Sequence, residues 1–197
     1  TTSTMILEFL NENLTEKQIK YLTNINKTSM NMSRLVNDLL DVTSIEAGKL
    51  YLDISSENYI DFVKSNIQFN QDLFDKKRIK LKLNYEDNIP EILFDKNKMT
   101  QVMDNLLSNA AKYSYADTKV TVEVKKENNY IITTVMDQGQ GISSDEVQNI
   151  FKPFHKANVK TTGGEKSTGL GLVIIKKIIE GHGGKAGIES KKGEGSK

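Results

Sequence analysis

The chain has 197 residues, 37% of them hydrophobic and 27% charged, with a formal net charge of +1. This composition is typical of a soluble globular protein, and the small net charge argues against a nucleic-acid partner. Cysteine is absent, which excludes a disulfide framework, a thiolate metal site and a cysteine nucleophile. No run approaches the ~20 apolar residues of a membrane helix. We therefore expect a cytoplasmic chain without membrane contact, and the attachment of any longer parent protein to the cell membrane stays open.

The N-terminal quarter of the chain carries the signals of one long helix. LTEKQI (residues 14–19) can begin it, because Thr15 can cap the first turn while Gln18 reaches back, as in a capping box. Gly48 is a natural C-terminal stop. A helix over residues 15–47 would be nearly 50 Å long at ~1.5 Å per residue.

Apolar residues recur along this predicted helix every seven positions. The repeat is carried by Ile25, Met32 and Leu39. Such a stripe favours a helical bundle or coiled coil over an isolated helix. Residues 1–13 are expected to be the tail of a shorter partner helix, so that residues 1–50 belong to a helical hairpin that pairs with a second copy.

The remaining residues, 51–197, mix helical and strand patterns. Helices are expected at residues 57–75, 96–113 and 170–181, and strands at residues 79–85, 120–124, 130–136 and 185–190. The polar, glycine-rich segment 157–169 is expected to be a loop. Because strands and helices do not alternate strictly, this region is predicted to be an α/β sandwich. The whole chain is therefore placed in the α+β class.

The stretch NLLSNAAKYS (residues 105–114) keeps two asparagines one helical turn apart on a largely apolar helix. On a helical wheel Asn105, Asn109, Lys112 and Tyr113 share an arc of about 100°. Amide oxygens are hard ligands that suit Mg²⁺ shared with phosphates, and the lysine adds a cation. A polar edge that simply faces water is the alternative.

A second candidate element, DQGQGI (residues 137–142), directly follows an apolar strand. Asp137 at the strand end can accept a hydrogen bond from an exocyclic amine, while the Gly-x-Gly turn closes around a flat ligand. Adenine is a good candidate for that ligand. The alternative is an ordinary turn.

A third element, STGLGL (residues 167–172), places glycines at the start of a helix. Free backbone N–H groups and the helix dipole favour a phosphate there. A glycine-rich helix entry without a ligand is the alternative.

Together and in this order, the elements resemble the sensor histidine kinases of two-component systems, whose ATP-binding domain is of the wider gyrase, Hsp90 and MutL (GHKL) type with a Bergerat-type sandwich. The resemblance covers nearly the whole chain. It is carried by QVMDNLLSNAAKYS as the N box, DQGQGI as the first glycine box, FKPF (151–154) as the F box, STGLGL as the second glycine box, RLVNDLLDVTSIEAGKL (34–50) as the end of the dimerisation domain and EGHGGKAGIES (180–190) as the closing segment.

This resemblance implies a Mg-ATP site with particular roles. Asn109 would coordinate Mg²⁺ and Asn105 would face the same ion. Lys112 and Tyr113 would contact the nucleotide. Asp137 would bind the adenine amine.

The resemblance also implies roles for the glycine boxes and for a lid over residues 155–168, anchored by Phe151 and Phe154. Lys156 stands where the family often has an arginine near the γ-phosphate, and lysine keeps the charge without the bidentate fork. Asn105, Lys112 and Lys156 are the expected catalytic residues. The further expected nucleotide contacts are Gly139, Gly141, Ile142, Phe154, Thr168, Gly169, Leu170, Gly171 and Leu172.

As a function, the resemblance implies ATP binding and γ-phosphoryl transfer to a histidine, in a homodimer that signals to the receiver domain of a response regulator. No histidine precedes His155, so we expect the chain to begin after the phosphoacceptor and not to phosphorylate itself. GEGSK (193–197) stops where a last strand is expected.

Two other functions are considered. A gyrase- or Hsp90-type ATPase would carry a glutamate, as general base for water, where this chain has Asn105, so its hydrolysis should be poor. The second alternative is a pseudokinase, which binds a nucleotide and acts as an interaction module.

Overall fold

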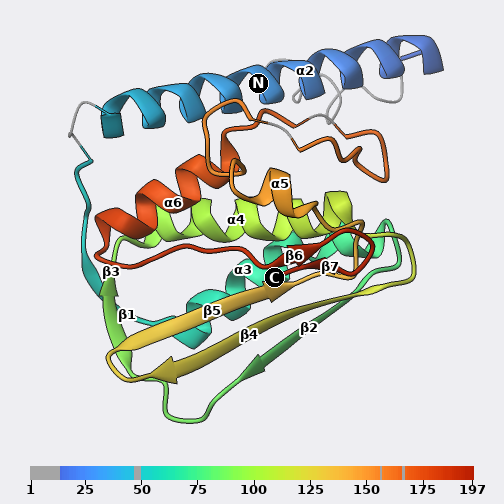
Figure 1. Ribbon diagram of the computed structural model, residues 1–197. Helices are drawn as coiled ribbons and strands as arrows, with labels where there is room; N and C mark the ends of the chain where they lie inside the picture. Colours follow the sequence, from blue (N-terminus) through green and yellow to red (C-terminus); the bar gives the residue numbers. More distant parts are fainter. Residues whose placement is uncertain (1–13, 47–49, 156, 166) are drawn as a thin grey trace. The chain divides into compact units, whose positions relative to one another are not determined.

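The computed structural model describes residues 14–46, 50–155, 157–165 and 167–197. The chain divides into two units, Thr1–Ala47 and Gly48–Lys197. Their elements are labelled in Figure 1. No helix among the described residues is both long and apolar enough to cross a membrane.

The described part of the first unit is one long helix, α2 (Glu16–Glu46). It begins with the predicted capping box: the backbone N–H of Thr15 donates to Gln18 Oε1 at 2.9 Å, and the N–H of Gln18 donates to Thr15 Oγ1 at 3.4 Å. The long helix expected from the sequence is therefore present. The partner helix expected within residues 1–13 lies outside the described residues.

The second unit is an α/β sandwich built on a three-stranded sheet. Strand β2 (Lys80–Tyr85) runs parallel to β4 (Lys119–Glu127), which pairs antiparallel with β5 (Tyr130–Met136) through the hairpin predicted at residues 128–129. Helices α3 (Tyr59–Asp75) and α4 (Lys96–Tyr113) cover one face of this sheet, and α6 (Gly171–Gly181) packs on α4 (Figure 1).

The core lies between the sheet and these helices. Val120, Val122 and Val124 alternate along β4 and are fully buried, as the period of two predicts for the inward face of a strand. A cluster of three aromatic rings closes one end of the core. It consists of Tyr59, Phe62 and Phe94, whose ring centroids lie 5.0–5.8 Å apart.

The smaller elements of the unit are where the structure differs from the sequence prediction. Strands β1 (Ser55–Asn58) and β3 (Glu91–Phe94) form an antiparallel pair, and α5 (Ser144–Val147) is a single turn. None of these three was predicted. The strand expected at residues 185–190 is wrong over 185–189; the chain there forms only a two-residue strand β6 (Ser190–Lys191), paired with β7 (Gly195–Ser196).

Candidate functional site

Helix α4 carries the two asparagines on the edge of its buried face. Its first turn is fixed by Asp95, whose Oδ1 accepts from the N–H of Lys98 and whose Oδ2 accepts from the N–H of Asp53, both at 2.9 Å. The helix then buries its apolar side, with Leu107 completely inaccessible. This packing fixes the direction of the polar edge.

The amides of Asn105 and Asn109 are half-buried but make no hydrogen bond to another side chain or backbone group in the described parts of the chain. Asn105 faces the start of α6: a Cβ placed on Gly171 would lie 2.9 Å from Asn105 Oδ1. Glycine therefore allows the first turn of α6 to approach this amide. These two amides therefore keep their donors and acceptors available to a ligand or to water.

At the end of β5, the Asp137 carboxylate uses only one of its oxygens within the described structure. Oδ1 accepts from the N–H of Gly139 at 2.8 Å and from that of Ser196 at 3.2 Å. No described residue donates to Oδ2. Burial raises the pKa of Asp137 above its ordinary value, although these two backbone hydrogen bonds oppose the rise.

The end of α4 meets Asp137 at Gly139. A Cβ placed on Gly139 would lie 2.4 Å from the carbonyl oxygen of Tyr113 and 2.8 Å from Asp137 Oδ1, so any larger residue would push the two apart. Ser114, which follows Tyr113, pairs with Gly139 in an isolated bridge and is completely buried. Its hydroxyl has no partner among the described residues. Two polar groups where Asp137 meets α4, Asp137 Oδ2 and the Ser114 hydroxyl, therefore have no hydrogen-bond partner among the described residues.

The C-terminal hairpin, β6 and β7, packs against the first glycine box (residues 137–142). This support was not predicted from the sequence. The N–H of Asp137 donates to Ser196 O at 2.9 Å, and the N–H of Ile142 donates to Ser190 Oγ at 2.9 Å. Gly141 has a φ of +63°, and a Cβ there would lie 1.9 Å from Lys191 O. No local motif signals these contacts.

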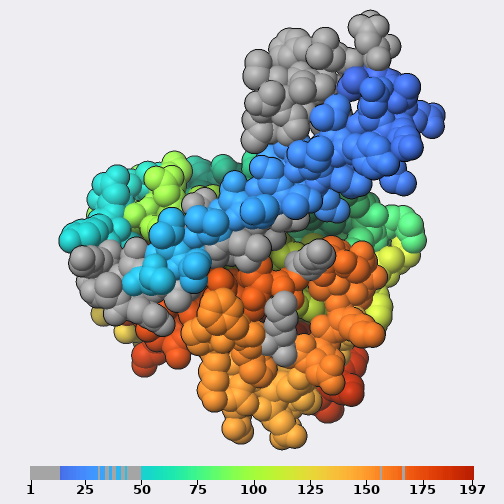
Figure 2. All heavy atoms as spheres, turned by 90° about the horizontal axis from the view of Figure 1, so that it is seen from above, coloured from blue at the N-terminus to red at the C-terminus, as the bar shows by residue number. Residues whose placement is uncertain are grey.

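The F box and the second glycine box flank residues 155–168, the expected lid segment, and they meet at Phe154 and Gly169. The N–H of Phe154 donates to Gly169 O at 3.1 Å, and both residues have positive φ, +60° and +77°. A Cβ on Gly169 would lie 2.9 Å from His155 O, so this close approach requires glycine. Seen from above, the residues around the lid, in orange, gather on one face of the second unit (Figure 2).

Next to the lid, the second glycine box leads into α6. The N–H of Leu170 donates to Thr168 Oγ1 at 3.2 Å, and the first intrahelical bond runs from Ile174 N to Leu170 O. The N–H groups of the residues between them therefore have no partner within the helix. The side chain of Leu170 is buried in the core, whereas Gly171 and Leu172 are half-buried.

The structure joins the predicted boxes at three places: Asn105 lies beside Gly171, Tyr113 beside Gly139, and Phe154 beside Gly169. Lys112 and Tyr113 are half-buried on the last turn of α4. Lys156 lies outside the described residues. No group of three or more His, Cys, Asp or Glu side chains that could hold a metal occurs among the residues described.

Comparison with known proteins agrees with this geometry. Residues 94–197 match the family described as histidine kinase-, DNA gyrase B-, and HSP90-like ATPase. The chain belongs to this family.

Among curated relatives, the chain is 35% identical over 188 residues to the sensor protein GacS of Pseudomonas syringae pv. syringae, which covers 93% of the chain and 21% of GacS. It is 32% identical over 185 residues to the cell-division control histidine kinase PdhS of Brucella ovis, covering 89% of the chain and 18% of PdhS. The chain thus spans about a fifth of the length of these relatives. The chain is thus similar to one region of these sensor proteins, and the family match over residues 94–197 agrees with the ATP-binding region that the sequence predicts.

Two solved structures share the fold. Full-length ShkA, crystallised in complex with AMPPNP, has a TM-score of 0.80 at 23% identity and covers 99% of this chain and 40% of its own. The Acinetobacter baumannii histidine kinase AdeS has a TM-score of 0.73 at 22% identity and covers 99% of this chain and 90% of its own.

Proposed function

We propose that the second unit binds Mg-ATP and positions its γ-phosphate for transfer to a histidine supplied by another segment. The observation that carries this proposal is the half-buried Asp137 carboxylate, with one oxygen held by backbone N–H groups and the other without a partner in the described structure. An acceptor fixed in this way suits the exocyclic amine of adenine.

The other groups suit the rest of the nucleotide. Asn109 and Asn105 offer amide oxygens, which are ligands that Mg²⁺ accepts, and Lys112 adds a cation at the same end of α4. The N–H groups at the start of α6 favour the phosphates. Lys156 would add charge near the γ-phosphate. Bound Mg²⁺ would neutralise charge on the β- and γ-phosphates.

In the proposed reaction, a histidine ring nitrogen forms a bond to the γ-phosphorus, the bond from that phosphorus to the bridging oxygen breaks, and ADP leaves. Catalysis of such a transfer depends on positioning and charge neutralisation rather than on covalent chemistry by the protein. Asn105 cannot take a proton from water at neutral pH. Transfer to histidine is therefore favoured over hydrolysis.

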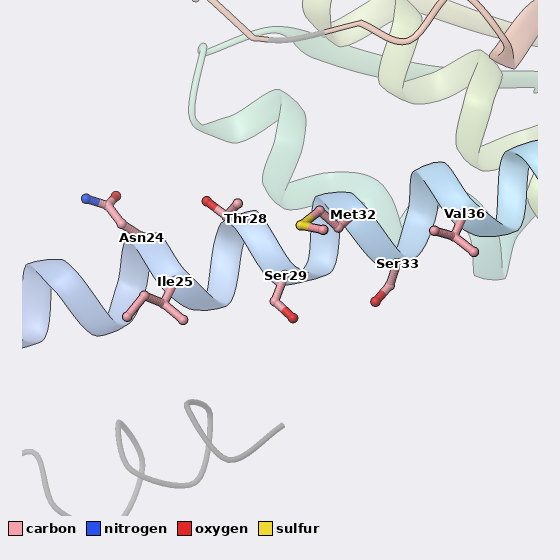
Figure 3. A pocket seen from close by; sticks show the side chains of 7 residues that line it. All are labelled: Asn24, Ile25, Thr28, Ser29, Met32, Ser33 and Val36. Atoms are coloured by element: carbon pink, nitrogen blue, oxygen red, sulfur yellow. The ribbon is translucent and has the colours of Figure 1, made fainter.

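We further propose that α2 pairs with a second copy and that the phosphoryl group passes on to a receiver domain. Support for pairing comes from an exposed apolar stripe on α2, with Ile25 58%, Met32 62% and Val36 54% exposed. Figure 3 shows these side chains beside the polar ones of α2 that line the same pocket, Asn24, Thr28, Ser29 and Ser33. A stripe of this kind on a long helix is typical of a helix–helix interface.

Transfer from ATP labelled on its γ-phosphate tests the proposal. The chain alone should acquire little label, whereas the chain joined to a histidine-bearing dimerisation segment should be labelled on that histidine. Asn109→Ala should slow labelling about a hundredfold, as expected when one charge-stabilising group is lost. Asn97→Ala, exposed at the other end of α4, is the control. Label on the present chain at the rate of the extended one would contradict the proposed acceptor.

A further inference from the structure

Lys77 makes contacts that none of the nucleotide motifs explains. It lies between α3 and β2, and its side chain is only 19% exposed although Lys76 and Arg78 on either side are exposed. A lysine ammonium loses hydration on burial and needs charged or polar partners to compensate. These partners come from two other parts of the second unit.

The first set of partners is the end of α4. Lys77 Nζ donates to the carbonyl oxygen of Ala111 at 2.8 Å and lies 3.3 Å from that of Lys112. Carbonyls in the last turn of a helix have no intrahelical partner and form the negative end of its dipole. A cation at this place therefore stabilises the end of the helix.

The second set belongs to the lid segment. Lys77 Nζ donates to Thr162 Oγ1 at 2.9 Å and forms an ion pair with Glu165 Oε1 at 2.7 Å. Burial raises the pKa of Glu165, but the hydrogen bond from Lys77 contributes to bringing it below its ordinary value. The carboxylate is therefore ionised at neutral pH. We call Lys77, Thr162 and Glu165 the Lys77 cluster.

Thr162 also binds the end of α4 directly. Its N–H donates to Lys112 O at 2.9 Å, and its hydroxyl lies 2.6 Å from Ser114 O. A second tether holds the same stretch of the lid, because the side chain of Gln140 donates to Lys160 O at 2.7 Å. Residues 160–165 are thus attached to the backbone beside Lys112 and Tyr113.

We infer that Lys77 is a positioning residue of the nucleotide site, which holds the lid segment against the end of α4 and thereby slows release of the bound nucleotide. The inference rests on the proposed nucleotide site. Without the Lys77 cluster, residues 160–165 lose their charged link to α4. The segment then spends less time docked beside Lys112 and Tyr113, which are proposed to contact the nucleotide, and apparent affinity falls with that fraction.

Hydrogen exchange on the nucleotide-free chain tests the link itself. Lys77→Met and Glu165→Gln should each raise exchange in residues 157–165, and at the Thr162 amide in particular, about tenfold, because a hydrogen bond to a charged group is lost. Lys76→Met, the exposed neighbour, should leave it unchanged. Lys77→Met could lower the stability of the whole unit and raise exchange for that reason. Glu165→Gln changes only a loop residue, so a rise in exchange in this variant still reports on the contact itself. Unchanged exchange in both variants would overturn the inference.

Release of a fluorescent ATP analogue with Mg²⁺, followed by stopped flow, tests the consequence. Lys77→Met should release it roughly ten- to a hundredfold faster, and the charge-conserving Lys77→Arg should release it more slowly than Lys77→Met. The double variant with Glu165→Gln should add little, since both act through one contact. If the unaltered chain binds the analogue and Lys77→Met releases it at the same rate, the inference is wrong. If the unaltered chain does not bind, the proposed function fails, and the exchange result still decides on the Lys77 cluster.

Discussion

At the scale of single residues, Asp137 has two differently placed oxygens on one carboxylate. Both backbone donors, Gly139 and Ser196, reach Oδ1. An asparagine could therefore keep both bonds through its amide oxygen and place its NH₂ group where Oδ2 lies. The substitution would leave the local structure intact but present a donor to the adenine amine, which is itself a donor.

Asp137→Asn should therefore separate binding from stability. ATP affinity, measured by calorimetry, should fall roughly ten- to a hundredfold with the loss of a hydrogen bond to a charged acceptor. Urea unfolding at neutral pH should show a variant that is at least as stable as the unaltered chain. Asp145→Asn, an exposed carboxylate on α5, is the control. Unchanged ATP affinity in Asp137→Asn would contradict the adenine assignment.

The pH dependence of this stability difference has a defined sign. Burial raises the pKa of Asp137 in the folded chain, so the folded state binds the proton more tightly than the unfolded state. The free energy of unfolding of the unaltered chain then falls as pH rises from the ordinary carboxyl pKa of about 3.9 through the raised value. The advantage of Asp137→Asn should be largest above that window and disappear below it.

Candidate site residues could be found from the sequence where they lie within one short motif. Asn105 and Asn109 are one helical turn apart, and Asp137 lies two residues before Gly139. Their expected roles came from the family resemblance and remain predictions. Lys77 and Ser196 were not found because their partners Thr162 and Asp137 are 85 and 59 positions away. Nothing in KKRIK distinguishes the half-buried lysine from its exposed neighbours.

At the scale of elements, His182 joins the end of α6 to the start of α4. Its Nδ1 lies 2.8 Å from Ile178 O, and the N–H of Asp95 donates to its Nε2 at 3.0 Å. A carbonyl only accepts and a backbone N–H only donates, so Nδ1 is the donor to Ile178 and Nε2 is the acceptor from Asp95. One imidazole thus links the ends of the two helices that carry the asparagines and the second glycine box.

His182→Ala should lower the free energy of unfolding by about 1–3 kcal/mol, because Asp95 is buried and its N–H would lose its acceptor. Denaturant unfolding of the variant measures this loss. Lys185→Ala, three residues further on and exposed, should change stability little. Equal stability of both variants would mean that the link between α4 and α6 does not depend on the imidazole.

Elements were predictable in proportion to their length and periodicity. The bounds of α4 and β5 agree with the sequence expectation because their apolar patterns are long enough to define a period. Strands β1 and β3 have four residues each, too few to show alternation, and each is a strand only because it pairs with the other. Residues 185–189 alternate in sequence but have no partner strand in the described structure.

At the scale of the whole molecule, the two units have different surfaces. The second unit has a buried apolar core between sheet and helices, whereas α2 leaves several large apolar side chains exposed, Leu39 included at 47%. Exposed stripes of this length on a helix are unfavourable in water, and a second copy of α2 can cover them. The seven-residue repeat therefore supports the proposed pairing of two α2 helices.

The replacement of Ile25 and Met32 together by glutamate should weaken self-association, because it places four like charges in the paired interface. Sedimentation over a range of concentrations should show the unaltered chain associating and the double variant shifted towards monomer by roughly tenfold or more in dissociation constant, since each lost apolar side chain is worth about 1.5–3 kcal/mol. Thr23→Glu, which the 100° spacing places on the other side of the helix, is the matched control. ATP affinity should stay the same in all three proteins, because the substitutions lie in the first unit and the nucleotide site in the second. A chain that is monomeric at every concentration tested would show that α2 alone does not pair.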